Sequence, residues 1–205
     1  VLNKIASLVP GLVGGAADLA PSTKTYLKGL GDYGAANRGG RNMHFGIREH
    51  AMSAITNGMQ LHGGLTAFCS TFFVFSDYMK NGMRMSAIMD LPVIYTLTHD
   101  SIGVGEDGPT HQPIEQLAAL RTMPNMRVFR PADYAETVAA YVTALKSKCP
   151  TSIVCSRQNL VQLENSGRDA LRGGYIADDC DGKPDLILIA TGSEVGLAIE
   201  AKKIL

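Results

Sequence analysis

Short apolar runs alternate with longer segments of helical periodicity along most of this 205-residue chain. The apolar runs are typical of buried strands and lie at residues 65–70, 92–98, 126–129 and 151–155. The helical patterns lie at residues 48–62, 78–89 and 132–146, and Asp133 and Glu136 resemble a capping box at the start of the last one. Strands that alternate with helices usually pair in parallel. We therefore predict an α/β fold with a mostly parallel sheet and helices on both faces.

The alternation stops near Asn165. Residues 165–184 are polar and rich in turn-forming residues, which predicts a linker after a first domain at residues 1–164. Residues 185–205 then predict one strand and one helix, which cannot bury a core by themselves and indicate a truncated second α/β unit. The chain also begins with a helical pattern at Val1, so we expect both ends to be cut from a longer protein.

The bulk composition excludes several classes of protein. The formal net charge is zero, so nothing in it favours nucleic acid or an anionic membrane surface. The four cysteines show no CxxC spacing, which argues against a disulfide framework or a zinc site. No apolar run reaches the length of a membrane span. We predict a cytoplasmic protein, with a plastid as the alternative because a targeting peptide would lie upstream of Val1.

Residues 98–113, THDSIGVGEDGPTHQP, carry the highest density of chemically active side chains. They follow a predicted strand that ends at Thr98, and ligands of open α/β sheets bind outside the carboxyl ends of strands. Two histidines and three carboxylates stand among three glycines, a set that suits proton transfer to a small polar substrate. A solvated surface loop is the alternative.

Two other segments are candidates for a site. GIREHAM (46–52) opens a predicted helix with Glu49, which could equally be a carboxylate that stabilises the helix start. TFFVFSDY (71–78) places Phe72, Phe75 and Tyr78 every third residue, a helical spacing that is also typical of a core stripe.

Taken together, these three segments resemble the transketolase family of thiamin diphosphate enzymes. GGAADLAPS (14–22), RPAD (130–133) and SRQNL (156–160) extend the resemblance over essentially the whole chain. The resemblance implies the pyrimidine-binding middle domain and the start of a C-terminal domain. The implied activity moves a two-carbon ketol unit from a ketose phosphate to an aldose phosphate. The implied partner is a second copy, in a homodimer that shares the site with the diphosphate domain of the other chain.

The resemblance also implies residue roles. Glu49 would hydrogen-bond the aminopyrimidine ring of the cofactor, while Phe72, Phe75 and Tyr78 would hold that ring by stacking. The implied catalytic residues are Glu49, His99 and His111, with both histidines facing the sugar. The implied substrate-binding residues are Ser22, His99, Asp107, His111 and Arg157; Ser22 and Arg157 would bind the distal phosphate and Asp107 would bind a hydroxyl.

No GDG motif occurs in the chain, although thiamin diphosphate enzymes use one to hold the diphosphate and Mg²⁺. The chain is therefore expected to lack metal ligands and to be inactive alone, with the Mg²⁺ ligands in a separate N-terminal domain. Three alternatives remain at this point: a subunit of a split transketolase, a dihydroxyacetone synthase-like enzyme, and a non-catalytic interaction module of the same fold.

Overall fold

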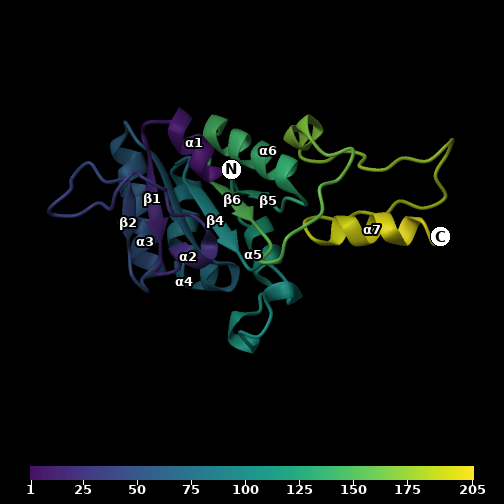
Figure 1. Ribbon diagram of the computed structural model, residues 1–205, viewed down its shortest axis with the longest axis horizontal. Coiled ribbons are helices and arrows are strands. Elements are labelled where there is room, and N and C mark those ends of the chain that lie inside the picture. The colour runs from purple at the N-terminus through teal and green to yellow at the C-terminus, as the bar shows by residue number, and fades with distance from the viewer.

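The computed structural model describes all residues, 1–205. Its sheet has six parallel strands in the order β2-β1-β3-β4-β6-β5 (Figure 1). The strands are β1 Leu12–Ala16, β2 Asn42–His44, β3 Thr66–Phe72, β4 Ile94–Thr98, β5 Arg127–Phe129 and β6 Thr151–Val154. The predicted parallel α/β sheet is confirmed, and four of its strands lie where the apolar runs indicated.

Helices cover both faces of the sheet (Figure 1). They are α1 Leu2–Leu8, α2 Ala20–Thr23, α3 Glu49–His62, α4 Ser76–Ile88, α5 Gln116–Arg121, α6 Tyr134–Lys146 and α7 Glu194–Lys202. One buried cluster packs α3, α4 and α5 on the sheet through Met52, Met83 and Leu120. A second cluster packs α1 and α6 on the other face through Leu2 and Tyr141. Each face is therefore closed by its own apolar layer.

The capping box predicted for α6 is present. The Asp133 carboxylate accepts a hydrogen bond from the Glu136 amide at 2.8 Å, and the Glu136 carboxylate accepts one from the Ala132 amide at 2.7 Å. The first bond satisfies a backbone donor that the first helical turn leaves open, and the second fixes the chain just before the N-cap Asp133. The helix consequently begins at Tyr134, two residues after the predicted start.

The sequence pattern did not predict β1 and β2. Strand β1 contains Gly14 and Gly15, which have low strand propensity. A Cβ on Gly14 would lie 1.9 Å from the Phe68 carbonyl oxygen, and one on Gly15 would lie 1.8 Å from the Met43 carbonyl oxygen. Glycine is therefore required here by close backbone approach, the situation in which propensity misleads. Strand β2 has three residues, too few for a periodic signal.

Residues 185–190 form no strand, contrary to the prediction, whereas the following helix is present as α7. A strand needs a neighbour to accept and donate its backbone hydrogen bonds, and this segment pairs with no strand of the sheet. Its side chains are correspondingly exposed, with Ile187 71% and Ile189 92% accessible. Helix α7 lies beside the main domain rather than within its layers (Figure 1).

No helix has the length and apolarity needed to cross a membrane. The four cysteines are free thiols.

Candidate functional site

The predicted site residues gather at one edge of the sheet. All six strands run in the same direction, so the segments that follow them emerge at the carboxyl edge. Each predicted residue ends a strand, or lies in the loop or helix start that follows β1, β2, β3, β4 or β6. They are Ser22, Glu49, Phe72, Phe75, Tyr78, His99, Asp107, His111 and Arg157.

An aromatic cluster joins two of these segments. The ring of His99 stacks on Phe72 with centroids 3.7 Å apart and planes 24° apart. Phe75 lies 5.9 Å from Phe72, 6.0 Å from Tyr78 and 5.1 Å from the ring of His111, edge to face in the last case. The structure thus brings the three aromatic residues and the two predicted histidines into one contact group.

The spacing of three in the aromatic residues does not come from a single helix, which corrects the helical interpretation. Phe72 is the last residue of β3, Phe75 closes a 3-10 turn at Phe73–Phe75, and Tyr78 lies in the first turn of α4. The cluster therefore leads from the core to solvent, because Phe72 is 7% exposed and Tyr78 is 67% exposed. A pure core stripe would be buried throughout.

His99 is buried and held in an uncommon backbone conformation. Its φ is +63°, in the left-handed region that costs energy for a residue with a Cβ. Its Nδ1 shares a hydrogen bond with the Thr98 hydroxyl at 2.9 Å. A strained residue that packing and hydrogen bonding hold in place is a common feature of functional sites.

The charges around His99 act in opposite directions. Desolvation lowers the pKa of His99, and the charges of Arg157 and His111 lower it further, while Asp107 and Asp100 partly offset them. The net shift is downward from the ordinary value of 6.5, so the imidazole is neutral at pH 7 and can accept a proton. Asp107, Arg157 and His111 are therefore electrostatic neighbours of His99.

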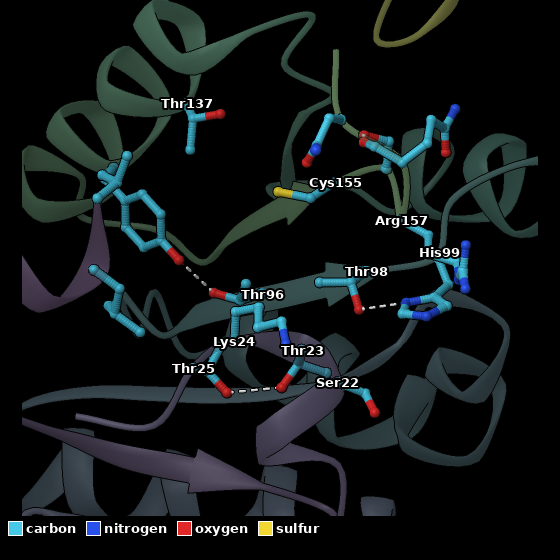
Figure 2. A pocket seen from close by; sticks show the side chains of 16 residues that line it. Ser22, Thr23, Lys24, Thr25, Thr96, Thr98, His99, Thr137, Cys155 and Arg157 are labelled. Carbon is cyan, nitrogen blue, oxygen red and sulfur yellow. Dashed lines mark hydrogen bonds between the residues drawn. The ribbon is translucent and has the colours of Figure 1, made fainter. Parts of the chain in front are cut away.

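A cleft of about 670 Å³ opens beside His99 (Figure 2). Ser22 and Arg157 line it together with His99, so the structure joins the two predicted phosphate-binding residues to the buried histidine. The rest of the lining is rich in hydroxyl groups, from Thr23, Thr25, Thr96, Thr98, Thr137, Tyr141 and Ser156. His111 and Asp107 do not line this cleft. Both belong to the loop after β4, in which His111 contacts the aromatic cluster.

The loop after β4 packs closely on the segment that follows β6. A Cβ on Gly103 would lie 2.6 Å from the Gln158 Oε1, and one on Gly105 would lie 3.7 Å from the Arg157 Cζ. Gly105 also has a φ of +93°, which side chains rarely adopt. The glycines among the charged residues thus let the loop follow the protein surface around Arg157.

Glu49 begins α3 and is 7% exposed, and its carboxylate takes part in none of the hydrogen bonds or ion pairs of the chain. The carboxylate oxygens of Glu49 have no donor within the chain but are not among the fully buried side-chain atoms that lack a partner, so they remain accessible to a donor from a ligand. No direct contact joins Glu49 to the aromatic cluster. Helices α3 and α4 lie on the same face of the sheet, and each follows a strand of the parallel sheet, so the two helices run in the same direction. They contact each other at Ser53 and Gly82. Glu49 and Tyr78 each lie four residues before that contact, and so at the same level.

Sequence reasoning missed one pair at this edge. Arg130, just after β5, forms a buried ion pair at 2.7 Å with Asp100, which follows His99. The RPAD motif singled out the arginine, but nothing in the local pattern named its partner 30 residues earlier. No group of three or more His, Cys, Asp or Glu side chains is placed to hold a metal ion.

Comparison with known proteins places this chain in a family. Residues 1–162 match the family model of the transketolase pyrimidine binding domain, and residues 173–205 match that of the transketolase-like C-terminal domain. A transketolase of Halalkalibacterium halodurans is 54% identical over 209 residues, which cover 100% of this chain and 31% of the relative. The chain thus spans about a third of the length of the curated relatives that it matches.

Solved structures agree. A Pichia stipitis transketolase in complex with sedoheptulose-7-phosphate superposes with a TM-score of 0.96 at 48% identity, over 100% of this chain and 31% of that one. A split-gene transketolase, described as an inactive "beta4 tetramer", matches 79% of this chain over 50% of its own length, with a TM-score of 0.63 and 32% identity. From its sequence, its sheet and these matches, the chain belongs to the transketolase family.

Proposed function

We propose that this chain is the aminopyrimidine-binding part of a transketolase. The whole protein would move a two-carbon ketol unit from a ketose phosphate to an aldose phosphate with thiamin diphosphate. The observation that carries the proposal is Glu49, a largely buried residue whose carboxylate has no partner within the chain, at the level of an aromatic cluster that is open to solvent.

The residues at this edge fit the cofactor ring. An aminopyrimidine is a flat aromatic ring with nitrogen atoms at its rim. Phe72, Phe75 and Tyr78 offer it aromatic faces, each contact adding about 1 kcal/mol beyond burial. Glu49 offers its ring nitrogen a carboxylate that strengthens as the ring gains positive character. When bound, the cofactor supplies the electron sink for the transferred two-carbon unit.

His99 and His111 are the proposed proton-handling groups on the substrate side. The neutral imidazole of His99 can accept a proton from a sugar hydroxyl, and His111 lies 6.1 Å from the same Phe72 ring, edge to face. The exposed Asp107 carboxylate is suited to accept a hydrogen bond from a second hydroxyl. These three groups would orient the sugar above the aromatic cluster.

Ser22 and Arg157 are the proposed phosphate-binding pair. They line the same cleft as His99, and a guanidinium offers paired donors that match phosphate oxygens. The complex of the Pichia stipitis relative with a sugar phosphate supports substrates of this class.

The chain would provide one side of the complete site. We propose a homodimer in which the diphosphate domain of the second copy, with Mg²⁺, faces the exposed Tyr78. We keep the division into a domain at 1–164, a linker at 165–184 and the start of a second unit at 185–205; the matches at residues 1–162 and 173–205 support two units, and the second match begins within the proposed linker. We propose the cytoplasm as its compartment.

Replacement of Glu49 by Gln in the full-length protein tests the proposal. The change keeps the size and one acceptor but removes the charge, so hydrogen exchange at the thiazolium C2 of bound cofactor should slow at least about 10²- to 10³-fold. Glu106→Gln, which neutralises an exposed carboxylate of the loop after β4, is the control and should exchange like the parent. Exchange at the parent rate in the Glu49 variant would refute the cofactor role and favour a carboxylate that only stabilises the start of α3.

A separate subunit of a split enzyme is the second candidate, favoured by the likeness to the split-gene transketolase. The mass of the intact gene product separates the two: a product the size of this chain indicates a subunit, and one about three times longer indicates a segment of a single-chain enzyme.

A further inference from the structure

The Arg130 side chain connects two segments that are distant in sequence. It is 8% exposed, and its Nε donates to the Asp100 carboxylate at 2.7 Å. Its Nη1 donates to the Thr191 carbonyl at 2.9 Å and to the Glu194 carboxylate, and its Nη2 lies 3.4 Å from the Ser193 hydroxyl. Burial disfavours the charged form, but the bonds to Glu194 and Asp100 outweigh it and raise the pKa of Arg130. The guanidinium is therefore charged, and each of its three nitrogens has a partner.

On one side, Arg130 is the only partner of a buried carboxylate. Asp100 is 1% exposed at its side chain, and its second oxygen has no hydrogen-bond partner. Without Arg130 this carboxylate would be a buried, uncompensated charge, which proteins do not tolerate without rearrangement. Asp100 directly follows His99, whose left-handed backbone needs neighbours that fix it.

On the other side, Arg130 makes all the hydrogen bonds that join the C-terminal segment (residues 185–205) to the main domain (residues 1–164), including that from the Gly192 amide to the Arg130 carbonyl at 2.9 Å. Gly192 has a φ of +59°, and a Cβ there would lie 2.8 Å from both Cγ and Nε of Arg130. The turn at residues 191–194 therefore fits the arginine only while residue 192 is glycine.

We propose that Arg130 is a positioning residue that couples the docking of Thr191–Glu194 to the conformation of His99. The fork of one guanidinium holds both the carboxylate beside His99 and the start of α7. When the turn at residue 192 displaces the arginine, Asp100 loses its partner and the His99 backbone loses its support. The inference rests on the proposed function only where it treats His99 as substrate-facing.

Hydrogen–deuterium exchange of the full-length protein, measured by mass spectrometry, tests the coupling. Arg130→Met and Gly192→Ala should each speed exchange of the amides at residues 98–104 about tenfold, the effect of losing one charged hydrogen bond. Gly196→Ala, in α7, is the control, because a Cβ at residue 196 meets no atom within 4 Å. Glu194→Ala, which also removes a bond to Arg130, is paired with Glu200→Ala, which removes only the exposed pair with Lys203.

A kinetic measurement separates this coupling from general destabilisation, which would lower both kcat/KM and C2 exchange of the cofactor. In Gly192→Ala, kcat/KM for the ketose phosphate should fall about tenfold while C2 exchange of the cofactor stays at the parent rate, because Glu49 lies on another element.

Each outcome decides the matter. If Arg130→Met speeds only amides beyond residue 185, the arginine merely anchors the C-terminal segment and the inference is overturned. If it speeds residues 98–104 but Gly192→Ala and Glu194→Ala do not, the coupling is overturned. If Arg130→Met fails to fold, those two variants carry the test. If the variants show the expected exchange pattern but the parent protein does not transfer a ketol unit, the proposed function is refuted and the role of Arg130 remains supported.

Discussion

Two aspartates of the loop after β4 show what residue identity alone leaves open. Asp100 is buried against Arg130, whereas Asp107 is exposed and acts on His99 only through its charge. Both are carboxylates in the same glycine-rich stretch, and family resemblance pointed only to Asp107. The partner of Asp100 could not be predicted, because it depends on how β4 and β5 are arranged around β6. Motifs thus located the candidate residues, while pairing and burial required the fold.

Asp107→Ala should reduce kcat/KM for hydroxylated sugar substrates about 10- to 100-fold in the full-length protein, because a lost hydrogen bond to a charged group costs about 1.5–3 kcal/mol. Hydrogen exchange at C2 of the cofactor should stay at the parent rate, since the lost bond goes to the substrate. Steady-state kinetics with a ketose phosphate, and with an analogue that lacks the hydroxyl, provide the check. An equal loss with both substrates would argue against hydroxyl recognition.

His99 should make folding stability depend on pH. The pKa of His99 is lowered in the folded chain, so below the ordinary value of 6.5 the unfolded chain binds a proton at His99 more readily than the folded chain does. This stability is fully present above the ordinary value of 6.5 and is lost as the pH falls from there towards the lower folded pKa. Urea unfolding at pH 5.5 and 7.5 should show a smaller pH effect in His99→Gln than in the parent. His62→Gln, at the exposed end of α3, is the control; if the two variants matched, His99 would not be the cause.

At the scale of helices and strands, periodicity succeeded where side chains face a single environment. Helices α3, α4 and α6 and strands β3 to β6 lie close to their predicted positions. Periodicity failed where close backbone contact, or the presence of a neighbouring strand, determines whether a strand forms. Strand β1 tolerates two glycines because neighbouring strands approach them closely, and residues 185–190 have strand-like side chains but no strand to pair with. The aromatic residues at the junction from β3 into α4 have the spacing of three that a helix would give, because a strand end and a 3-10 turn place them at that spacing.

The packing of α3 on α4 depends on Gly82. A Cβ there would lie 2.0 Å from the Ser53 Oγ, so Gly82→Ala should force the helices apart and destabilise the fold by about 1–3 kcal/mol. Gly58→Ala, in α3 with no atom within 4 Å of the added Cβ, should instead stabilise it by about 0.5–1 kcal/mol. Thermal unfolding of both variants gives the comparison. A Gly82 variant as stable as the parent would show that the helices can separate freely, and that the level of Glu49 relative to Tyr78 is not fixed by this contact.

At the scale of the whole molecule, the candidate site residues come from five separate segments because one parallel sheet brings these segments to a common edge. The fold class and this edge followed from the alternation of strands and helices. The division of the edge did not: His99 lines the hydroxyl-rich cleft and also stacks on Phe72, whereas the three aromatic residues of the cluster do not line that cleft. His99 takes part in both because it lies directly after the central strand β4.

The purified 205-residue chain should not transfer a ketol unit between sugar phosphates, nor bind Mg²⁺-thiamin diphosphate tightly. Most of the charge of this ligand is on its diphosphate, and the chain has no cluster of groups placed to hold the metal. A coupled enzymatic assay and isothermal titration calorimetry test both statements, with the full-length protein as the positive control. Turnover by the isolated chain would contradict the proposal that it forms one side of a shared site.

The strand order also imposes a sequence of events on a nascent chain. Strand β4 pairs on one side with β3, which is synthesised before it, and on the other with β6, about 55 residues later. At roughly 5–20 residues per second, translation leaves that second edge without its partner for several seconds. The strand is buried along its whole length in the folded domain, so during this interval a core strand presents an unpaired row of backbone N–H and C=O groups. Synthesis on the ribosome therefore passes through a stage in which a central strand has one open edge, and slow codons between β4 and β6 would prolong that stage.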